Sequence, residues 1–246
     1  MINCQPLTIA IRKTLWDTAH SKNVTLHNYK MKKTTLILIT ICFGIFISCN
    51  SKDSNSKTNY NSQEKFEFQN GDVIFQTSQS RQSKAIQLAT NSKYSHVGII
   101  YNNSNKLYVF EAVQPVKITP LESWINRGKN KHYVVKRLIN SNDVLDSKTI
   151  SKMKQAGEKY LNKNYDIYFE WTDDKIYCSE LVWKIYKEAA NIEIGELEKL
   201  SDFDLTNNIV REILKERYGN NIPMDEVVIS PESIYNSDLL ETIYEN

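Results

Sequence analysis

The clearest hydrophobic pattern in the chain is helical and lies in its second half. From Cys178 onward, apolar residues recur at spacings of three and four, which predicts an amphipathic helix ending near Ala190. The apolar stripe of this helix comprises Cys178, Leu181, Val182, Ile185 and Ala189. Cys178 is therefore expected in the first helical turn, facing the interior.

Shorter patterns predict the other elements of a folded domain. Helices are expected at 83–90, 120–126, 147–161 and 204–218. Thr119 and Ser147 are the expected caps of the second and third of these helices, with Pro120 at the first helical position of the second. Strands are expected at 71–75, 96–101, 107–113, 133–138 and 227–229. Because strands and helices do not alternate strictly, we expect an α+β domain with a mainly antiparallel sheet.

Two of these strands form a predicted hairpin around residues 102–105. A four-residue loop pairs Tyr101 with Lys106, and a centred two-residue loop gives the same register. This register places His96 directly opposite Glu111. Directly opposed residues on one face have Cβ atoms about 4.5–5.5 Å apart. We therefore expect the carboxylate of Glu111 to hydrogen-bond one ring nitrogen of the imidazole.

The N-terminal region has the pattern of a bacterial export signal. A basic start at Lys32 and Lys33 precedes 13 almost wholly apolar residues, whereas a membrane-spanning helix needs about 20. The run ends in Phe46-Ile47-Ser48-Cys49, which resembles a bacterial lipobox. We predict a lipoprotein signal peptide over 31–48 with lipidation at Cys49; the alternative is an uncleaved membrane anchor.

The flanking segments complete the predicted domain organisation. Residues 1–30 precede the signal, and we interpret them as a misannotated N-terminal extension that starts ahead of Met31. Residues 50–65 contain no aliphatic side chain and are rich in Ser, Asn and Lys, so 49–66 is expected to be a flexible tether. The folded domain is expected over 67–246.

Composition and charge narrow the class of protein. The 246 residues are 41% hydrophobic and 24% charged, with 7 Gly and 5 Pro, which excludes collagen-like, wholly disordered and multi-span membrane chains. Cleavage before Cys49 would leave 25 basic and 28 acidic side chains, a net charge of −3. We therefore expect no nucleic-acid partner. Because there is no Cys-x-x-Cys or His-Glu-x-x-His pattern, we also expect no metal and no cofactor.

Cys178 is the one thiol left in the predicted mature domain. Taken alone, a free cysteine is more often a small buried hydrophobe, and a strand His or Glu is more often structural. A Cys, a His and a Glu together instead indicate a cysteine nucleophile with its supporting groups. A helix N-terminus and an imidazolium stabilise a thiolate, and a carboxylate orients the imidazole. The free backbone N–H of Cys178 could bind an oxyanion.

Three short motifs resemble the YiiX/YebB-like branch of the NlpC/P60 superfamily, the papain-like bacterial cysteine hydrolases. They are Tyr94-Ser95-His96-Val97-Gly98-Ile99, Phe110-Glu111-Ala112 and Tyr177-Cys178-Ser179-Glu180-Leu181. The order His, acid, Cys is that of the circularly permuted branch. The resemblance implies a permuted papain-like fold with Cys178 as nucleophile, His96 as general base and Glu111 as orienting acid. It also implies a substrate groove at Tyr165 and Tyr177, although such aromatic residues more often serve packing.

The resemblance also implies a function. Relatives cleave amide bonds in peptidoglycan stem peptides, next to D-glutamate or diaminopimelate. We therefore expect a cysteine amidase or peptidase, tethered to a membrane in the cell envelope, whose substrate is a peptide or amino-acid amide. Two alternatives stay open: a lipid acyl or ester hydrolase or acyltransferase, because the permuted branch resembles lecithin:retinol acyltransferase-like proteins, and a non-catalytic peptide-binding lipoprotein.

Overall fold

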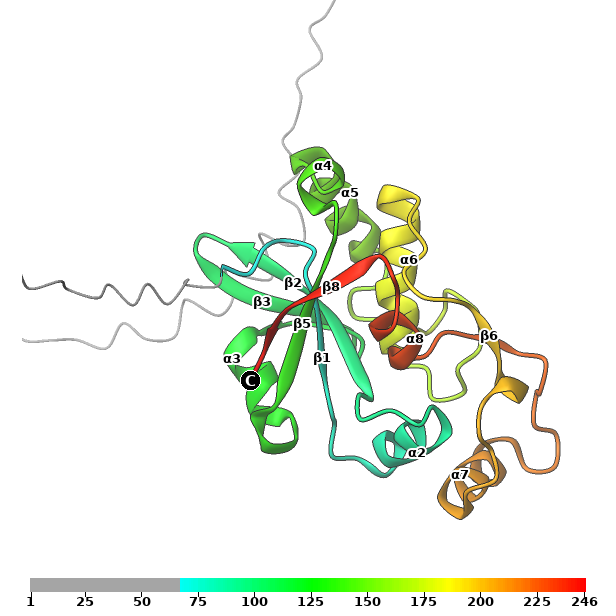
Figure 1. The fold of residues 1–246 in the computed structure, drawn as a ribbon. Helices are drawn as coiled ribbons and strands as arrows, with labels where there is room; N and C mark the ends of the chain where they lie inside the picture. The colour runs from blue at the N-terminus through cyan, green and yellow to red at the C-terminus, as the bar shows by residue number, and fades with distance from the viewer. Residues whose placement is uncertain (1–66) are drawn as a thin grey trace, which may run out of the picture. The chain divides into compact units, whose positions relative to one another are not determined.

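The computed structural model describes residues 67–246, which fold around a six-stranded sheet (Figure 1). The strand order is β4-β3-β2-β1-β5-β8, and every neighbouring pair is antiparallel. The strands are β1 (Val73–Gln76), β2 (His96–Asn103), β3 (Lys106–Glu111), β4 (Lys117–Pro120), β5 (Tyr133–Leu138) and β8 (Leu240–Glu245). β6 (Glu198–Lys199) and β7 (Val227–Val228) form a separate two-stranded sheet. The predicted α+β class with a mainly antiparallel sheet is confirmed.

Helices cover both faces of the sheet. They are α2 (Arg81–Ala89), α3 (Leu121–Arg127), α4 (Ser141–Val144), α5 (Ser147–Glu158), α6 (Cys178–Ala190), α7 (Asn208–Tyr218) and α8 (Pro231–Tyr235). Trp124 of α3 packs in one apolar cluster with Val109 of β3. The next strand residue, Phe110, faces the other way and contacts Gly157 of α5. Within 67–246, no helix is long and apolar enough to cross a membrane.

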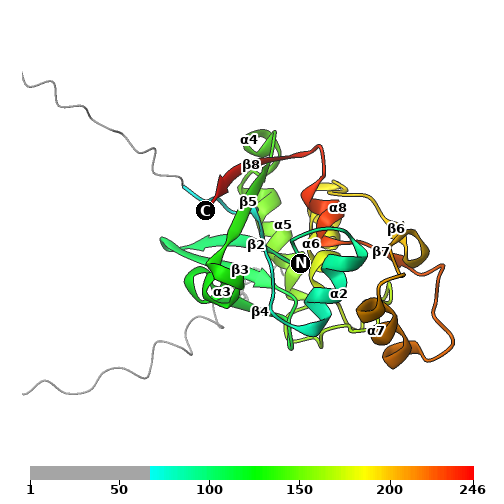
Figure 2. The same ribbon diagram turned by 60° about the horizontal axis from the view of Figure 1, so that its bottom comes forward.

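Helix α7 lies away from the large sheet and packs against α2 (Figures 1 and 2). Apolar side chains from both helices and from the chain between β6 and α7 form one cluster, whose buried members are Ala85, Leu200, Val210, Ile213 and Leu214. At the surface, Arg81 of α2 pairs with Glu212 at 3.1 Å and with Glu216 at 2.7 Å. α2 and α7 thus form a second apolar layer beside the sheet.

The predicted caps of α5 and α3 were wrong, and so were the predicted starts of α2 and α7. α2 starts at Arg81, with Ser80 as its cap, and not at residue 83. Asp146, rather than Ser147, caps α5, because its side chain accepts a hydrogen bond from the N–H at the third helical position. α7 starts at Asn208 instead of residue 204, with Asn207 as its cap. Thr119 does not cap α3, because it lies in β4 and Pro120 occupies the cap position.

The predicted register of the β2–β3 hairpin was also wrong, by two residues. The turn is Ser104-Asn105, and Asn103 pairs with Lys106. Both turn residues have positive φ, at 52° and 64°, as a two-residue hairpin turn with the favoured twist requires. His96 is therefore not directly opposite Glu111.

Candidate active site

Cys178 is the first residue of α6 and is 2% exposed. The chain is extended at Tyr177, whose backbone N–H donates to the Glu180 carboxylate at 3.3 Å and so helps to start the helix there. The predicted helix from Cys178 to Ala190 is confirmed at both ends. The thiol thus lies where the helix presents free N–H groups and a partial positive charge.

The hydrogen bond between His96 and Glu111 is present despite the different register. Glu111 Oε2 lies 2.7 Å from His96 Nε2. A shift of two residues keeps every side chain on its own face, so the two residues become diagonal rather than direct neighbours. Continuing the observed pairs places Gly98 opposite Glu111, where no side chain intervenes.

The second oxygen of the Glu111 carboxylate has its own donors. Thr119 Oγ1 and Arg127 Nη2 each donate to Oε1 at 2.5 Å, and the Glu111 side chain is fully buried. Burial alone would raise the pKa of Glu111, but His96, Arg127 and Thr119 outweigh it and lower that pKa to about 2. Neither Thr119 nor Arg127 was predicted as a partner of the acid. Thr119 lies two residues from Lys117, the strand partner of Glu111. Side chains two residues apart on a strand lie on the same face, and this spacing was the sequence signal for Thr119.

His96 links the carboxylate to the thiol. With Nε2 facing Glu111, the other ring nitrogen is left for the hydrogen bond with Cys178. Burial would lower the pKa of His96, but the bonds with Cys178 and Glu111 raise it to about 9. Burial would raise the pKa of the thiol, but His96 and two nearby backbone N–H groups lower it overall. This arrangement favours a thiolate beside an imidazolium. The ring of Trp124 stacks on the imidazole at 5.8 Å.

The two predicted groove residues lie in different positions. The Tyr165 hydroxyl accepts from Gln82 Nε2 at 3.0 Å and lies close enough to Cys178 for the thiol to raise its pKa. Burial raises the pKa of Tyr165 well above its ordinary value, so the hydroxyl stays protonated. The Tyr177 hydroxyl instead accepts from the backbone N–H of Ile229 at 3.0 Å, which fixes the chain before α8. Both rings line the same cavity.

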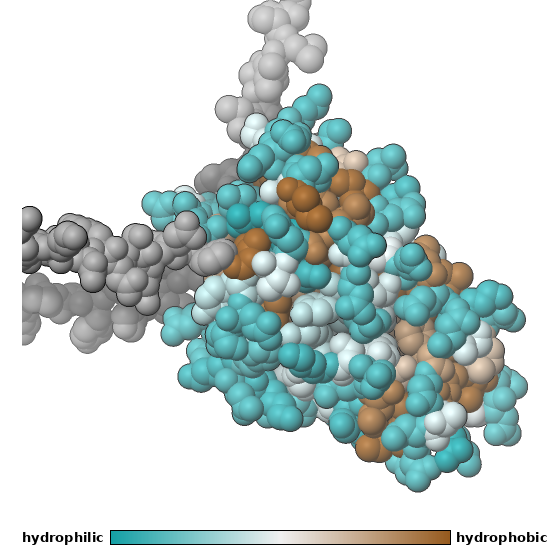
Figure 3. Space-filling model, viewed as in Figure 1, coloured by the Kyte–Doolittle hydropathy of each residue, from teal (hydrophilic) through white to brown (hydrophobic). Residues whose placement is uncertain are grey.

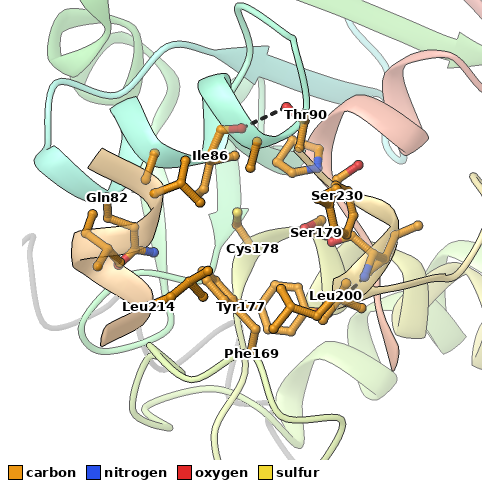
Figure 4. Close-up of a pocket in the computed structure, with 18 of the residues that line it drawn as sticks. Gln82, Ile86, Thr90, Phe169, Tyr177, Cys178, Ser179, Leu200, Leu214 and Ser230 are labelled. Atoms are coloured by element: carbon orange, nitrogen blue, oxygen red, sulfur yellow. Dashed lines mark hydrogen bonds between the residues drawn. The ribbon is translucent and has the colours of Figure 1, made fainter. Parts of the chain in front are cut away.

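A cavity of about 100 Å³ lies beside the sulfur, which points toward its centre (Figure 4). Most of its wall is apolar and comes from α2, from α7, from the chain between β6 and α7, and from the end of β7 with the residues that follow it. Its apolar side chains include Ala85, Ile86, Leu200, Val210 and Leu214. Apolar residues also lie at the molecular surface over this end of the domain, at the lower right of Figure 3.

A comparison with models of known protein families shows the family to which this chain belongs. A family model described as "Permuted papain-like amidase enzyme, YaeF/YiiX, C92 family" matches residues 67–244. This chain belongs to that family. The predicted family and the permuted papain-like fold are therefore confirmed, and the order His96, Glu111, Cys178 is the permuted one.

Two relatives show how far the similarity extends. The uncharacterized protein YiiX of Escherichia coli strain K12 is 49% identical over 175 residues, which are 71% of this chain and 85% of YiiX. A crystal structure described as the metalloprotein yiiX from Escherichia coli O157:H7 superposes with a TM-score of 0.69 at 49% identity, over 72% of this chain and 97% of that one. In the described part of the present chain, no group of three or more His, Cys, Asp or Glu side chains could hold a metal ion.

Proposed function

We propose that the protein is a cysteine amidase that cleaves a peptide or amino-acid amide through a thioester on Cys178. One observation carries the proposal: Cys178, His96 and Glu111 form a buried series at the edge of a cavity, in which Glu111 hydrogen-bonds His96 and His96 in turn lowers the pKa of the thiol. Such a series supplies a nucleophile, a proton carrier and an orienting acid. Membership of an amidase family supports the amide as the scissile bond.

The proposed reaction follows from the positions of these groups. The thiolate attacks the carbonyl carbon, and the backbone N–H of Cys178 and the Tyr165 hydroxyl are the donors that we assign to the resulting oxyanion. The imidazolium of His96 then gives its proton to the amide nitrogen, the C–N bond breaks, and an amine leaves. His96 next takes a proton from water, whose oxygen attacks the thioester. The C–S bond breaks and the acid product is released. This restores the thiolate of Cys178 and the imidazolium of His96.

We also propose the location and the substrate class. The basic and apolar pattern of residues 31–48, followed by Cys49, supports export and lipid anchoring in the cell envelope. These residues lie outside the described part of the chain. An exported amidase of this kind has peptidoglycan stem peptides within reach. Labelled palmitate should enter the full chain produced in a bacterial host and should not enter the Cys49→Ala variant; labelling of both would contradict the anchor.

The cavity favours a second candidate function. Its largely apolar wall would accept an acyl chain at the carbonyl attacked by Cys178. Such a protein would be a lipid acyl or ester hydrolase, or an acyltransferase, with the same thioester chemistry. The residues of the catalytic series are shared by both candidates, so only the substrate distinguishes them.

One experiment tests both candidates. The full chain in detergent is incubated with muropeptides and, separately, with a short acyl thioester, and new amines or thiols are measured by mass spectrometry. Release of amines by the wild-type chain and not by Cys178→Ala supports the amidase. Turnover of the thioester without any cleavage of peptides supports the second candidate, and no Cys178-dependent turnover of either excludes both.

A further inference from the structure

Arg217 is the charged side chain that lines the cavity beside Cys178. The other lining residues in the described part of the chain are apolar or neutral, apart from the thiol itself. Arg217 belongs to the last turn of α7 and is half-buried. Its guanidinium therefore introduces a full positive charge into the wall of a largely apolar space.

The hydrogen-bond partner of this guanidinium is neutral. Arg217 Nη2 donates to Gln82 Oε1 at 2.7 Å, and the group lies 5.3 Å from the centre of the Phe169 ring. Burial lowers the pKa of Arg217, although it stays charged at any ordinary pH. No carboxylate in residues 67–246 forms an ion pair with it.

Three of the other four arginines in residues 67–246 have acidic partners. Arg81, Arg127 and Arg137 each reach a carboxylate oxygen at 2.7 Å or less. Arg211, on the same helix as Arg217, is exposed to solvent and bonds an asparagine side chain. Arg217 combines partial burial with no carboxylate at ion-pair distance, and Glu216 and Asp166 act on it only from farther away. A ligand carboxylate in the cavity could therefore become its direct partner.

Arg217 is also connected to the nucleophile. Gln82, which accepts from Arg217, donates through Nε2 to the Tyr165 hydroxyl at 3.0 Å, and Tyr165 and Cys178 line the same cavity. Figure 4 shows Gln82 at one side of the cavity, with the sulfur at its centre. One small substrate could therefore contact the guanidinium and the reacting sulfur at the same time.

We propose that Arg217 is the centre of a carboxylate-binding subsite and that the substrate carries a carboxylate close to its scissile bond. The inference rests on the proposed function, since it names a property of that enzyme's substrate. A guanidinium has five donors in a planar fork, and one bond to Gln82 leaves donors for a carboxylate. No second cation lines the cavity in the described residues, so the site matches a single negative charge better than a phosphate dianion.

Two pairs of amides test the proposal with the full chain. The first pair is N-octanoyl-glycine and N-octanoyl-glycinamide, of which only the former has a carboxylate on the amine side of the scissile amide. The second pair is the mono-4-nitroanilide of adipic acid and hexanoyl-4-nitroanilide, of which only the former has a carboxylate on the acyl side. In at least one pair we expect the anionic member to have a kcat/KM about tenfold higher, mainly through KM. Arg217→Gln should reduce this preference to about one, and Arg217→Lys should keep part of it.

Arg211→Gln is the matched control, because it removes the same charge from the exposed side of α7. It should leave the preference unchanged. A thermal melt of each variant checks folding. Equal cleavage within both pairs by the wild-type chain would overturn the subsite and leave the amidase intact, and so would a preference that survives Arg217→Gln.

A binding assay separates failure of the subsite from failure of the amidase. Octanoate, octanamide and octyl phosphate are compared as protectants of Cys178 against iodoacetamide. If no amide is cleaved, the proposed function fails, and the subsite is judged by whether octanoate protects better than octanamide in an Arg217-dependent way. Stronger Arg217-dependent protection by octyl phosphate would replace the carboxylate with a phosphate and overturn the proposal.

Discussion

Glu111 meets His96 diagonally across β2 and β3, with 2.7 Å between carboxylate and imidazole, because Gly98 leaves the directly opposite position empty. A Cβ atom at Gly98 would lie 2.5 Å from Val109 Cγ1 and 2.9 Å from the backbone oxygen of Phe110. Neither distance is tolerated by a well-packed hairpin. The glycine thus allows the two strands to approach and the carboxylate to reach the imidazole.

The first prediction concerns this glycine. Gly98→Ala should destabilise the domain by about 1–3 kcal/mol, because the added methyl group must displace a buried side chain and a strand backbone. The displaced hairpin should also separate Glu111 from His96 and lower kcat. Urea unfolding and steady-state kinetics measure the two effects.

Val109→Ala provides the control for this steric argument. It removes the Cγ1 atom nearest to the added methyl group, so the double variant should be less destabilised than the sum of the two single variants. An additive double variant, or a Gly98→Ala protein as stable as the wild type, would contradict the argument.

The sequence predicted the helix that bears the nucleophile better than it predicted the hairpin. α6 shows a continuous apolar stripe, and its predicted ends were correct. The segment Asn102-Asn103-Ser104-Asn105 offers four turn-forming residues, so the pattern does not specify which two form the turn. The face of each residue was nevertheless correct, because both registers keep the same alternation, and that sufficed to bring His96 and Glu111 together.

Other features depend on contacts between distant segments. β4 was hidden because Thr119 and Pro120 also fit a helix start. β8 carries charged residues at the edge of the sheet and has little apolar alternation. Arg127 and Arg217 reach the site from α3 and α7, and nothing in their local sequence distinguishes them from surface arginines.

The second prediction concerns Arg127 as a positioning residue. Its guanidinium donates to the buried carboxylate of Glu111, which in turn holds the imidazole. Arg127→Met should lower kcat about tenfold with little change in KM, since a charged hydrogen bond of this kind contributes about 1.5 kcal/mol or more. The pH at which Cys178 becomes reactive toward iodoacetamide should also rise, because a less firmly ionised Glu111 stabilises the imidazolium less.

Lys117→Met is the matched control for Arg127→Met. Lys117 is the strand partner of Glu111 across β3 and β4, but it is exposed. Its replacement removes the same charge without removing a bond to the carboxylate. Arg127→Lys should recover part of the loss. Equal effects of Arg127→Met and Lys117→Met would show that net charge, rather than the hydrogen bond, matters.

The third prediction concerns the ionisation of the thiol. The pKa of Cys178 is lowered by His96 and that of His96 is raised to about 9, so the thiolate–imidazolium pair should form below the ordinary pKa of a thiol and persist to about pH 9. Iodoacetamide should therefore alkylate Cys178 rapidly even below pH 7. His96→Ala should slow alkylation at pH 6 by at least about tenfold, because an unpaired thiol has a pKa of about 8.5.

Mass spectrometry of the alkylated chain between pH 5 and 10 gives the full profile. A wild-type rate that rises steadily up to pH 8.5, as for a free thiol, would contradict the ion pair. It would also favour the non-catalytic binding protein over both enzymes. Tyr165→Phe removes the other side-chain partner of the sulfur and should leave the His96-dependent part of the profile in place.

The fourth prediction concerns Glu180, two residues beyond the nucleophile. Burial raises the pKa of this fully buried carboxyl to about 7, although Lys184 lies 2.7 Å away and opposes the shift. The native domain therefore keeps a proton that the unfolded chain loses above its ordinary pKa of 4.5. Unfolding releases that proton, so this group's contribution to stability is present below pH 4.5 and is lost as the pH rises through 7. The loss amounts to about 3 kcal/mol at most.

Glu180→Gln cannot ionise and should lack this part of the decline in urea unfolding free energy between pH 5 and 8. Glu188→Gln, which alters an exposed acid of the same helix, should keep the wild-type slope. Parallel slopes in all three proteins would mean that Glu180 is ionised in the native state at pH 5.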